Sequence, residues 1–422
     1  MNTLKRIIRS LLPRRLYRAL LSPYHFLISL FAALRYGFPA RRLTVILVTG
    51  TKGKSSVTEM LFTVLRHAGI PAAVAGTIRF AINDESRANL YKMTLPGHGF
   101  IQHFLADAVR AGAKVAVVEV TSEAVLQHRH RFLSPNALVF TNLQMEHIES
   151  HGSFEKYAAA KLRIGYELAK SGKRPRAIIA NADDRASAPY LALPVENVLP
   201  YRFADVTNMT AAPGSVSFTH DGTNYQMSLP GSFSVMNALA VIRAARFAGV
   251  APEKIADALR ALERIPGRTE RIEAGQDFHA IVDYAHTPDS LKALYSAYPC
   301  RKICVLGNTG GGRDTWKRPL MGAIADESCE EVILTNEDPY DEDPAKILEA
   351  MAGGMNREPR IILDRREAIK TALSLAKSGD AVLVTGKGTD PYIMGANGEK
   401  VSWSDADVMR EELAKLVSTR AA

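Results

Sequence analysis

Residues 43–58 read LTVILVTGTKGKSSVT, and this stretch decides the fold. It begins with an apolar and β-branched run at 43–48, which is typical of a buried strand. A glycine-containing turn follows at 49–53, and a helix is predicted to begin at Lys54. The inward N–H groups of such a turn, the positive end of the helix dipole and the lysine ammonium group together favour a bound polyphosphate.

The turn is a short form of a phosphate-binding loop, because Val48 stands where the longer pattern has its first glycine. Ser55 follows the lysine, where a hydroxyl group can bind Mg²⁺. The alternative is a tight strand-to-helix turn with a surface lysine. The order of strand, glycines, lysine, hydroxyl and helix favours phosphate binding. The predicted nucleotide-binding residues of the loop are Gly50, Thr51, Lys52, Gly53, Lys54, Ser55 and Ser56.

The length of 422 residues predicts two or three domains. Hydrophobic residues make up 47% of the chain and charged residues 23%, as in ordinary soluble globular proteins. Three cysteines, Cys300, Cys304 and Cys329, cannot all pair with one another and lack the spacing of a zinc site. We therefore expect a reducing, cytoplasmic environment.

The N-terminal arm, residues 1–42, carries nine Lys and Arg and no acidic residue. The rest of the chain holds 44 basic and 44 acidic residues, so its surface is not of the nucleic-acid-binding type and no nucleic acid partner is expected. An apolar run at 24–34 is too short to span a bilayer, and Pro23 is expected to interrupt any helix that enters it. Contact with an anionic membrane surface and docking on the adjacent domain are equally favoured, and nucleic acid binding is a weaker third alternative.

Candidate metal ligands follow the buried strands of the middle region. The strand predicted at 114–120 ends near Glu119. Bound molecules in open α/β sheets lie at the carboxyl ends of the strands, so Glu119 is a natural second residue to bind Mg²⁺. A water-facing carboxylate is the alternative. After the strand at 137–142 comes a loop that contains His147, where a metal or phosphate could sit, although a lone loop histidine is more often a surface residue. Lys161, on the next helix, would by itself be read as a solvated lysine.

The C-terminal part predicts a second parallel α/β unit, because four strands alternate with helices. Those strands are predicted at 279–282, 302–306, 331–334 and 381–384. Polar loops follow each strand, so the polar side chains that could bind a substrate lie at one edge of this sheet.

A small antiparallel segment is predicted at 201–229. Glycines at 310–312 lack the remainder of a dinucleotide fingerprint, which argues against NAD. The predicted domains are 1–42, 43–264 and 265–422.

Twelve motifs in order resemble those of the Mur ligase superfamily, and within it the UDP-N-acetylmuramyl-tripeptide synthetases, the MurE type. They are GTKGKSS (50–56), MTLPG (93–97), EVTSEA (119–124), TNLQMEHIESHG (141–152), YAAAK (157–161), NADD (181–184), GSFSVMNAL (231–239), IPGRTER (265–271), DYAHTPDSL (283–291), GGRDTWKRPLMG (311–322), NEDPYDEDP (336–344) and GKGTD (386–390). The resemblance implies a P-loop ATPase domain and a Rossmann-like α/β domain, here preceded by a basic amphipathic helical arm.

The resemblance also implies an ATP-dependent ligase that joins an amino acid to a muramyl-peptide carboxylate through an acyl phosphate, in peptidoglycan precursor synthesis. Its implied cofactors are ATP and two Mg²⁺ ions. The implied catalytic residues are Lys54, Glu119, His147 and Lys161, of which the last matches a carbamylated lysine. The implied metal ligands are Ser55, Glu119, His147 and Lys161. The implied contacts to the nucleotide are Asn237, Arg268 and Asp283. The implied substrate residues are Thr94, Ser122, Arg129, His286, Arg313, Asp338, Tyr340, Gly386 and Asp390.

Several positions depart from the family pattern. Glu146 and Glu149 replace two aspartates, with the charge kept. Glu123 replaces a histidine near the acceptor, and Ser234 replaces an asparagine. Tyr340 stands where diaminopimelate-adding members have the arginine that binds the distal carboxylate.

The sequence therefore leaves open which amino acid is added and which acceptor receives it. The acidic loop around Asp338 favours L-lysine or another cationic amino acid by charge, whereas Arg313 and Asp390 match diaminopimelate-contacting positions. Only 42 residues stand where the family has a UDP-binding domain. Either the arm and nearby loops hold a UDP-linked acceptor, or the acceptor is a lipid-linked muropeptide or a polyglutamate. A non-catalytic ATP-binding scaffold is the alternative from another class. We expect a cytoplasmic monomer, with the inner membrane face as the site of any arm contact.

Overall fold

A computed structural model describes residues 14–97, 99–146, 152–312 and 314–421. Contacts between residues divide the chain into two units. The first comprises residues 1–144, 153–202 and 239–255, and the second comprises 145–152, 203–238 and 256–422. Helices α9 (Gly231–Phe247) and α10 (Pro252–Arg260) contain residues of both units. The predicted domain boundaries stay a prediction.

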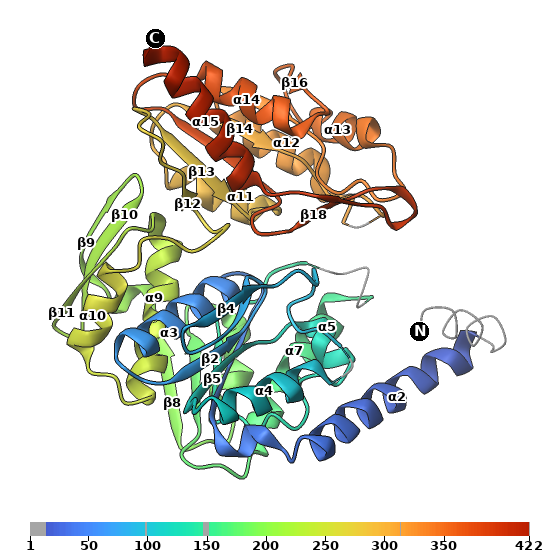
Figure 1. Cartoon of the computed structure of the whole chain (residues 1–422), viewed down its shortest axis with the longest axis vertical. Helices are drawn as coiled ribbons and strands as arrows, with labels where there is room; N and C mark the ends of the chain where they lie inside the picture. The colour runs from blue at the N-terminus through green and yellow to red at the C-terminus, as the bar shows by residue number, and fades with distance from the viewer. Residues whose placement is uncertain (1–13, 98, 147–151, 313, 422) are drawn as a thin grey trace. The chain divides into compact units, whose positions relative to one another are not determined.

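The first unit is built on one eight-stranded sheet (Figure 1). Its order is β4-β3-β2-β5-β1-β6-β7-β8, parallel except for the pairings of β3 and β4. The strands are β1 (Thr44–Thr49), β2 (Ala72–Ala75), β3 (Arg79–Ile82), β4 (Glu85–Ala88), β5 (Val115–Glu119), β6 (Ala137–Phe140), β7 (Ala177–Asn181) and β8 (Asn197–Tyr201).

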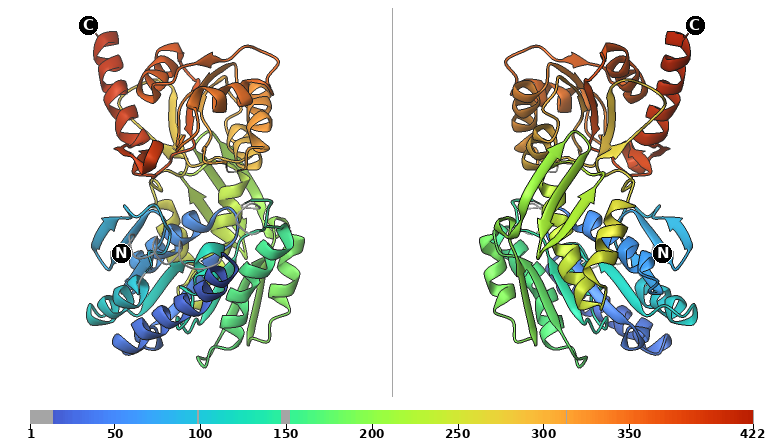
Figure 2. Two further views of the ribbon diagram at one scale, coloured as in Figure 1. Left: turned by 90° about the vertical axis from the view of Figure 1, so that its right-hand side faces the viewer. Right: turned by 90° about the vertical axis from the view of Figure 1, so that its left-hand side faces the viewer.

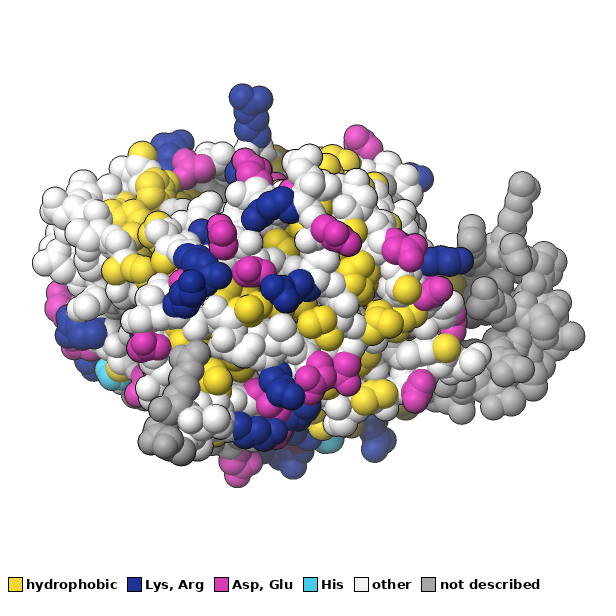
Figure 3. Space-filling model, turned by 90° about the horizontal axis from the view of Figure 1, so that it is seen from above, with side chains coloured by type: hydrophobic (Ala, Val, Ile, Leu, Met, Phe, Trp, Pro, Cys, Tyr) yellow, Lys and Arg dark blue, Asp and Glu magenta, His cyan; other side chains and the backbone are white. Residues whose placement is uncertain are grey.

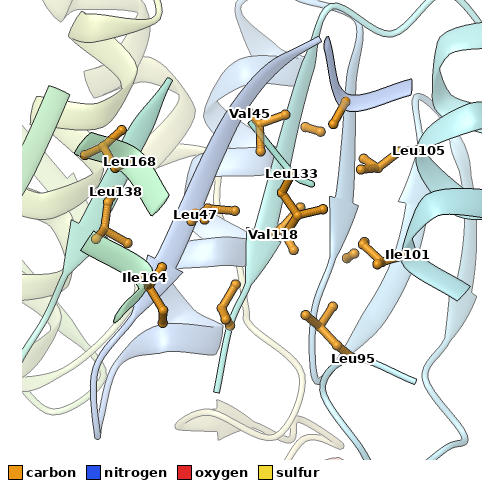
Figure 4. Close-up of a cluster of buried hydrophobic side chains, with 14 of the residues drawn as sticks. Val45, Leu47, Leu95, Ile101, Leu105, Val118, Leu133, Leu138, Ile164 and Leu168 are labelled. Atoms are coloured by element: carbon orange, nitrogen blue, oxygen red, sulfur yellow. The ribbon is translucent and has the colours of Figure 1, made fainter. Parts of the chain in front are cut away.

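Helices cover this sheet because alternate strand residues point to opposite faces. Val45 and Leu47 of β1 belong to the buried cluster of Figure 4, together with side chains of α4 and α7 such as Ile101 and Ile164. Helix α3 packs against β2 and β5 and contributes none of that cluster's residues. The helices are α2 (Arg14–Arg35), η1 (Pro39–Arg42), α3 (Lys54–His67), α4 (Phe100–Arg110), α5 (Ser122–Leu126), α7 (Phe154–Ala169), η2 (Arg185–Ser187) and α8 (Ala188–Leu191).

The strand order decides where the polar loops of this unit meet. Strand β1 lies between β5 and β6, with Val48 opposite Glu119 and Thr49 opposite Phe140. All three strands are parallel, so their carboxyl ends lie at the same edge of the sheet. The glycine-containing loop, Glu119 and the loop after β6 are thereby brought together.

The expectation that Pro23 interrupts the arm's helix was wrong, because α2 runs through it. Proline removes one backbone hydrogen bond and tends to bend a helix. Pro23 is exposed, so water can satisfy the carbonyl group that loses its donor.

The second unit contains the predicted antiparallel segment as a three-stranded sheet, a six-stranded sheet of order β12-β13-β17-β14-β15-β16, and a two-stranded sheet of β18 and β19. Its strands are β9 (Thr207–Ala212), β10 (Ser215–His220), β11 (Thr223–Met227), β12 (Glu270–Arg271), β13 (His279–Asp283), β14 (Lys302–Leu306), β15 (Glu331–Leu334), β16 (Arg360–Ile361), β17 (Ala381–Thr385), β18 (Tyr392–Met394) and β19 (Lys400–Ser402).

Helices lie on both faces of the six-stranded sheet (Figure 2). Side chains of α14 and α15 form one core with Val282, and those of α11, α12 and α13 form the other with Ile281. The helical segments of this unit are η3 (Phe203–Asp205), α11 (Pro288–Ser296), α12 (Lys317–Ser328), α13 (Pro344–Ala352), α14 (Arg365–Leu375), η4 (Ala396–Gly398) and α15 (Asp405–Ala421). Cys304 and Cys329 form a disulfide that the sequence did not predict, and Cys300 is free.

The face seen in Figure 3 carries Lys and Arg side chains interspersed with Asp and Glu. This agrees with the equal numbers of basic and acidic residues outside the arm. Among the described helices, none combines the length and apolar content needed to cross a membrane.

Acid should destabilise the first unit through His130, which is 2% exposed. Burial and the charge of Arg131 lower the pKa of His130 to about 3. An unfolded histidine has a pKa of about 6.5, so below that pH the unfolded chain binds a proton that the folded chain does not. The free energy of unfolding should therefore fall by about 2 kcal/mol between pH 8 and pH 5. Urea titrations of wild type and His130→Leu at both pH values measure this. His67→Gln, at an exposed histidine, is the matched control. An unchanged pH dependence in His130→Leu would contradict the assignment.

Candidate active site

The loop between β1 and α3 approaches the neighbouring strand end so closely that its first glycine is obligatory. A Cβ atom on Gly50 would lie 1.9 Å from Thr141 Oγ1, and the Gly50 φ is +147°. Gly53 caps α3 with a φ of +80°, in the left-handed region that favours glycine. Both glycines of the motif are thus required by geometry.

Side chains directly after β6 and on α7 fix the loop. Asn142 Oδ1 accepts from Lys52 N at 2.8 Å, and the backbone carbonyl of Asn142 accepts from Thr51 N at 2.8 Å. Thr141 Oγ1 donates to Lys52 O at 2.6 Å. The Tyr157 hydroxyl lies 3.0 Å from Thr51 Oγ1. The sequence reasoning assigned no role to Thr141, Asn142 or Tyr157, although two polar residues directly after a buried strand beside β1 were a usable signal.

Lys54 and the first turn of α3 directly follow this loop. Lys54 Nζ donates to Thr51 O at 2.8 Å, so the ammonium group is folded back over the loop backbone. Ser55 is buried and Ser56 is half-buried in the same turn. This places a full positive charge next to the partial positive charge of the helix N-terminus, which suits phosphate oxygens.

Glu119 is the centre of a small group of oxygen atoms. It is 1% exposed, and its Oε1 accepts from Ser55 Oγ at 3.0 Å. Its Oε2 accepts from Thr77 N at 2.8 Å. A hydroxyl and a carboxylate this close are hard oxygen donors of the kind that Mg²⁺ selects, so these residues fit one magnesium site.

The described side chains fit a second metal site less well than the first. Lys161 is 2% exposed, and its Nζ donates to Gly50 O at 2.5 Å. As an unmodified ammonium group it repels a cation. His147 lies outside the described residues. Among the described residues, no group of three or more His, Cys, Asp and Glu side chains could hold a metal.

Two predicted acceptor contacts lie near Glu119 and the neighbouring loop. Thr94 Oγ1 is 2.7 Å from the hydroxyl of Thr77, whose backbone N–H donates to Glu119. Arg129 donates to Leu95 O. Burial lowers the pKa of the Arg129 guanidinium. The structure therefore joins Thr94 to the candidate metal site.

A small hollow lies beside Arg129 and is shared with the arm. Its lining residues include His25 and Ser29 of α2, Gly97, Gln102 and Arg129. Ser122, another predicted contact, is buried at the start of α5. The arm thus contributes side chains next to a loop that the sequence associates with the acceptor.

In the second unit, three predicted residues gather around the carboxyl end of β13. Both carboxylate oxygens of Asp283 accept backbone hydrogen bonds, from Thr269 N and Ala285 N, each at 2.6 Å. The Arg268 guanidinium lies 4.4 Å from the centre of the Tyr284 ring. His286 Nε2 lies 2.9 Å from Glu146 Oε1 of the same unit. The charge of Asp390, followed by burial, raises the pKa of Tyr284 well above its usual value.

The acidic loop after β15 is already paired within the second unit. Asp338 is 3% exposed, and its Oδ1 accepts from Lys387 Nζ and from Met394 N, each at 2.8 Å. Burial and the charge of Asp338 raise the pKa of Glu337, whose Oε1 accepts from Thr309 Oγ1 at 2.8 Å. The charge argument for a cationic amino acid is therefore weaker than the sequence indicated.

The remaining predicted residues take different positions in this unit. A Cβ atom on Gly386 would lie 2.4 Å from Glu337 Oε2, so that loop also requires glycine. Asp390 lies 3.6 Å from Lys387 Nζ. Tyr340 has a φ of +51°, and Asn237 is half-buried in α9. Arg313 lies outside the described residues.

Comparison with known protein families finds a matching domain for both halves of the chain. Residues 48–245 match the Mur ligase middle domain, and residues 267–388 match the Mur ligase glutamate ligase domain. The chain is 36% identical, over 86% of its length and 77% of the relative's, to the UDP-N-acetylmuramoyl-L-alanyl-D-glutamate–2,6-diaminopimelate ligase of Syntrophomonas wolfei. It is 35% identical, over 91% and 81%, to the UDP-N-acetylmuramyl-tripeptide synthetase of a Roseiflexus species.

Solved structures agree with this assignment. A UDP-N-acetylmuramoyl-L-alanyl-D-glutamate–2,6-diaminopimelate ligase matches with a TM-score of 0.61 and 29% identity, over 89% of this chain and 79% of that one. The folylpolyglutamate synthase of Mycobacterium tuberculosis shares the fold, with a TM-score of 0.70 and 18% identity over 86% and 93%. The chain belongs to the Mur ligase superfamily, is similar to its MurE-type members, and is an ATP-dependent amide ligase.

Proposed function

We propose that this ligase adds L-lysine or diaminopimelate to the carboxylate of a muramyl peptide in peptidoglycan precursor synthesis. The observation that carries the proposal is the convergence of Ser55 and Thr77 on Glu119, beside a phosphate loop whose lysine begins α3. ATP is the phosphoryl donor. Attack of the acceptor carboxylate on the γ-phosphate gives an acyl phosphate and ADP. The amino group of the incoming amino acid then attacks the acyl carbon, and phosphate leaves.

The chain's own residues supply position and charge for these steps. Lys54, whose Nζ lies over the loop backbone, and the loop N–H groups would hold the phosphates, and Ser55 with Glu119 would hold one Mg²⁺. Bound magnesium would neutralise charge on the phosphate oxygens, which is the main task in phosphoryl transfer. Thr94, joined to Glu119 through Thr77, would orient the acceptor near the same oxygens.

A second magnesium site would need Lys161 to be carbamylated, with His147 as a further ligand. Carbamylation converts the buried cation into an anion that can face a metal. The position of Lys161 supports this, because the side chain is buried and its Nζ lies against the loop carbonyl of Gly50, beside the predicted phosphate loop.

The acceptor is UDP-linked or lipid-linked, and the arm takes part in holding it. The hollow shared by α2, Gly97 and Arg129 supports an arm contribution. We further propose that the protein is a cytoplasmic monomer whose arm contacts the inner face of the membrane. The basic composition of residues 1–42 supports that contact.

Replacing Lys54 tests the phosphate loop. Lys54→Ala should lower ATP-dependent phosphate release, in the presence of acceptor and amino acid, by roughly a hundredfold or more. Its thermal unfolding midpoint should stay near that of the wild type, because the side chain is only half-buried. Lys156→Ala, at an exposed lysine of α7, is the control and should keep full turnover. Retained turnover in Lys54→Ala would refute the assignment.

Chemical rescue and mass measurement test whether Lys161 is carbamylated. Lys161→Ala should lose most ligation, and added acetate or formate should restore part of it by supplying the missing carboxylate. Lys54→Ala should show no such rescue. Intact-mass measurement of the native protein should show one added CO₂. An unmodified lysine together with no rescue would contradict the proposal.

The amino acid can be identified with UDP-N-acetylmuramyl-L-alanyl-D-glutamate and equal amounts of L-lysine and meso-diaminopimelate, with products weighed by mass spectrometry. Because Tyr340 provides no cation for a distal carboxylate, we expect more lysine product from the wild type. Tyr340→Arg should raise the diaminopimelate-to-lysine ratio by roughly tenfold, as expected for one charged hydrogen bond. Tyr340→Phe is the control. A wild type that prefers diaminopimelate would show that another residue binds that carboxylate.

A further inference from the structure

Helix α2 carries a row of large apolar side chains that are exposed in the described structure. The members, Leu20, Tyr24, Leu27, Phe31 and Leu34, follow one another at alternating intervals of four and three residues. This spacing places them on one face of the helix. Their exposed fractions are 49%, 39%, 60%, 68% and 59%. We call this set the apolar row.

The opposite face already holds α2 on the first unit. Phe26 packs on Phe132 with ring centres 5.7 Å apart, and Ser22 Oγ lies 2.9 Å from His128 Nε2. Ala32 and Ala33 are buried, and helix α4 lies alongside (Figure 1). The helix therefore has an intramolecular partner on one side, and the apolar row is not needed for docking on its own domain.

Charge indicates what covers the apolar row. Residues 1–42 hold nine Lys and Arg and no acidic residue, and four of these arginines, Arg14, Arg15, Arg18 and Arg35, belong to α2 itself. A second copy of the arm would bring equal positive charges together, which disfavours association. An anionic bilayer surface satisfies both features, because acyl chains accept the apolar side chains and lipid phosphates attract the cations.

We propose that α2 lies in the interface of an anionic membrane, with the apolar row turned toward the acyl chains and the other face still packed on the first unit. The inference deepens the proposed arm contact and rests on that part of the proposed function, not on the ligase chemistry. It assigns the lipid contact to five described side chains rather than to the basic residues alone.

Vesicle co-sedimentation of the full chain, without ATP or acceptor, tests this inference. The wild type should pellet with phosphatidylcholine–phosphatidylglycerol vesicles and much less with phosphatidylcholine alone. The double variant Leu27→Glu, Phe31→Glu should lose binding by roughly tenfold or more. Leu320→Glu, at a 47% exposed leucine of α12, is the matched control and should bind like the wild type.

Three results would overturn the proposal: no binding of the wild type to anionic vesicles, undiminished binding of the double variant, or a wild-type dimer in solution that the double variant abolishes. The last would identify a second copy as the occupant. Ligation of a soluble acceptor by the wild type and by the same variants is measured separately. A wild type that binds vesicles but does not ligate would refute the proposed ligase function alone, and ligation by the double variant would show that this variant is folded.

Discussion

The structure of the first unit depends on how closely the β1–α3 loop lies against the end of β6. A side chain on Gly50 would collide with Thr141, and the backbone N–H groups of Thr51 and Lys52 donate to the backbone and side-chain oxygens of Asn142. The loop conformation is therefore set by packing before any ligand binds. Because β5 flanks β1 on the other side, the same strand order that fixes the loop also delivers Glu119 to it. The geometry of the candidate site here follows from the topology of a parallel sheet.

Much of the fold could be predicted because parallel strands are buried on both faces and read as continuous apolar runs. Residues 115–119 and 381–385 are examples, with every residue buried. Strand β4 was missed because all four of its residues are exposed and carry no apolar pattern. The loop and Glu119 could be located from strand ends. The hydrogen bond of Tyr157 to the loop could not, because the two partners lie 106 residues apart in the sequence.

The second unit shows why a cluster of acidic residues in a sequence need not give a negatively charged binding site. Arg365 is 2% exposed and binds both carboxylate oxygens of Asp405, at 2.7 Å each. Asp338 is similarly paired with the fully buried Lys387. Buried charges require such partners, so much of the polarity around β15 and β17 stabilises the loops themselves. Selectivity among amino acids must then come from groups that remain outside these pairs.

The hydrogen bond between Ser55 and Glu119 has a consequence for how well this pair is prepared to bind a cation. The Ser55 hydroxyl donates to Glu119 Oε1 at 3.0 Å, so the two oxygens already lie close together. They would hold a divalent ion, which would supply positive charge beside the phosphate loop. Both donors are held beforehand, one by a helix and the other by a strand, so little conformational entropy remains to be lost. The cation would bind to a preorganised site, and its affinity would be limited mainly by the free-energy cost of removing its hydration water.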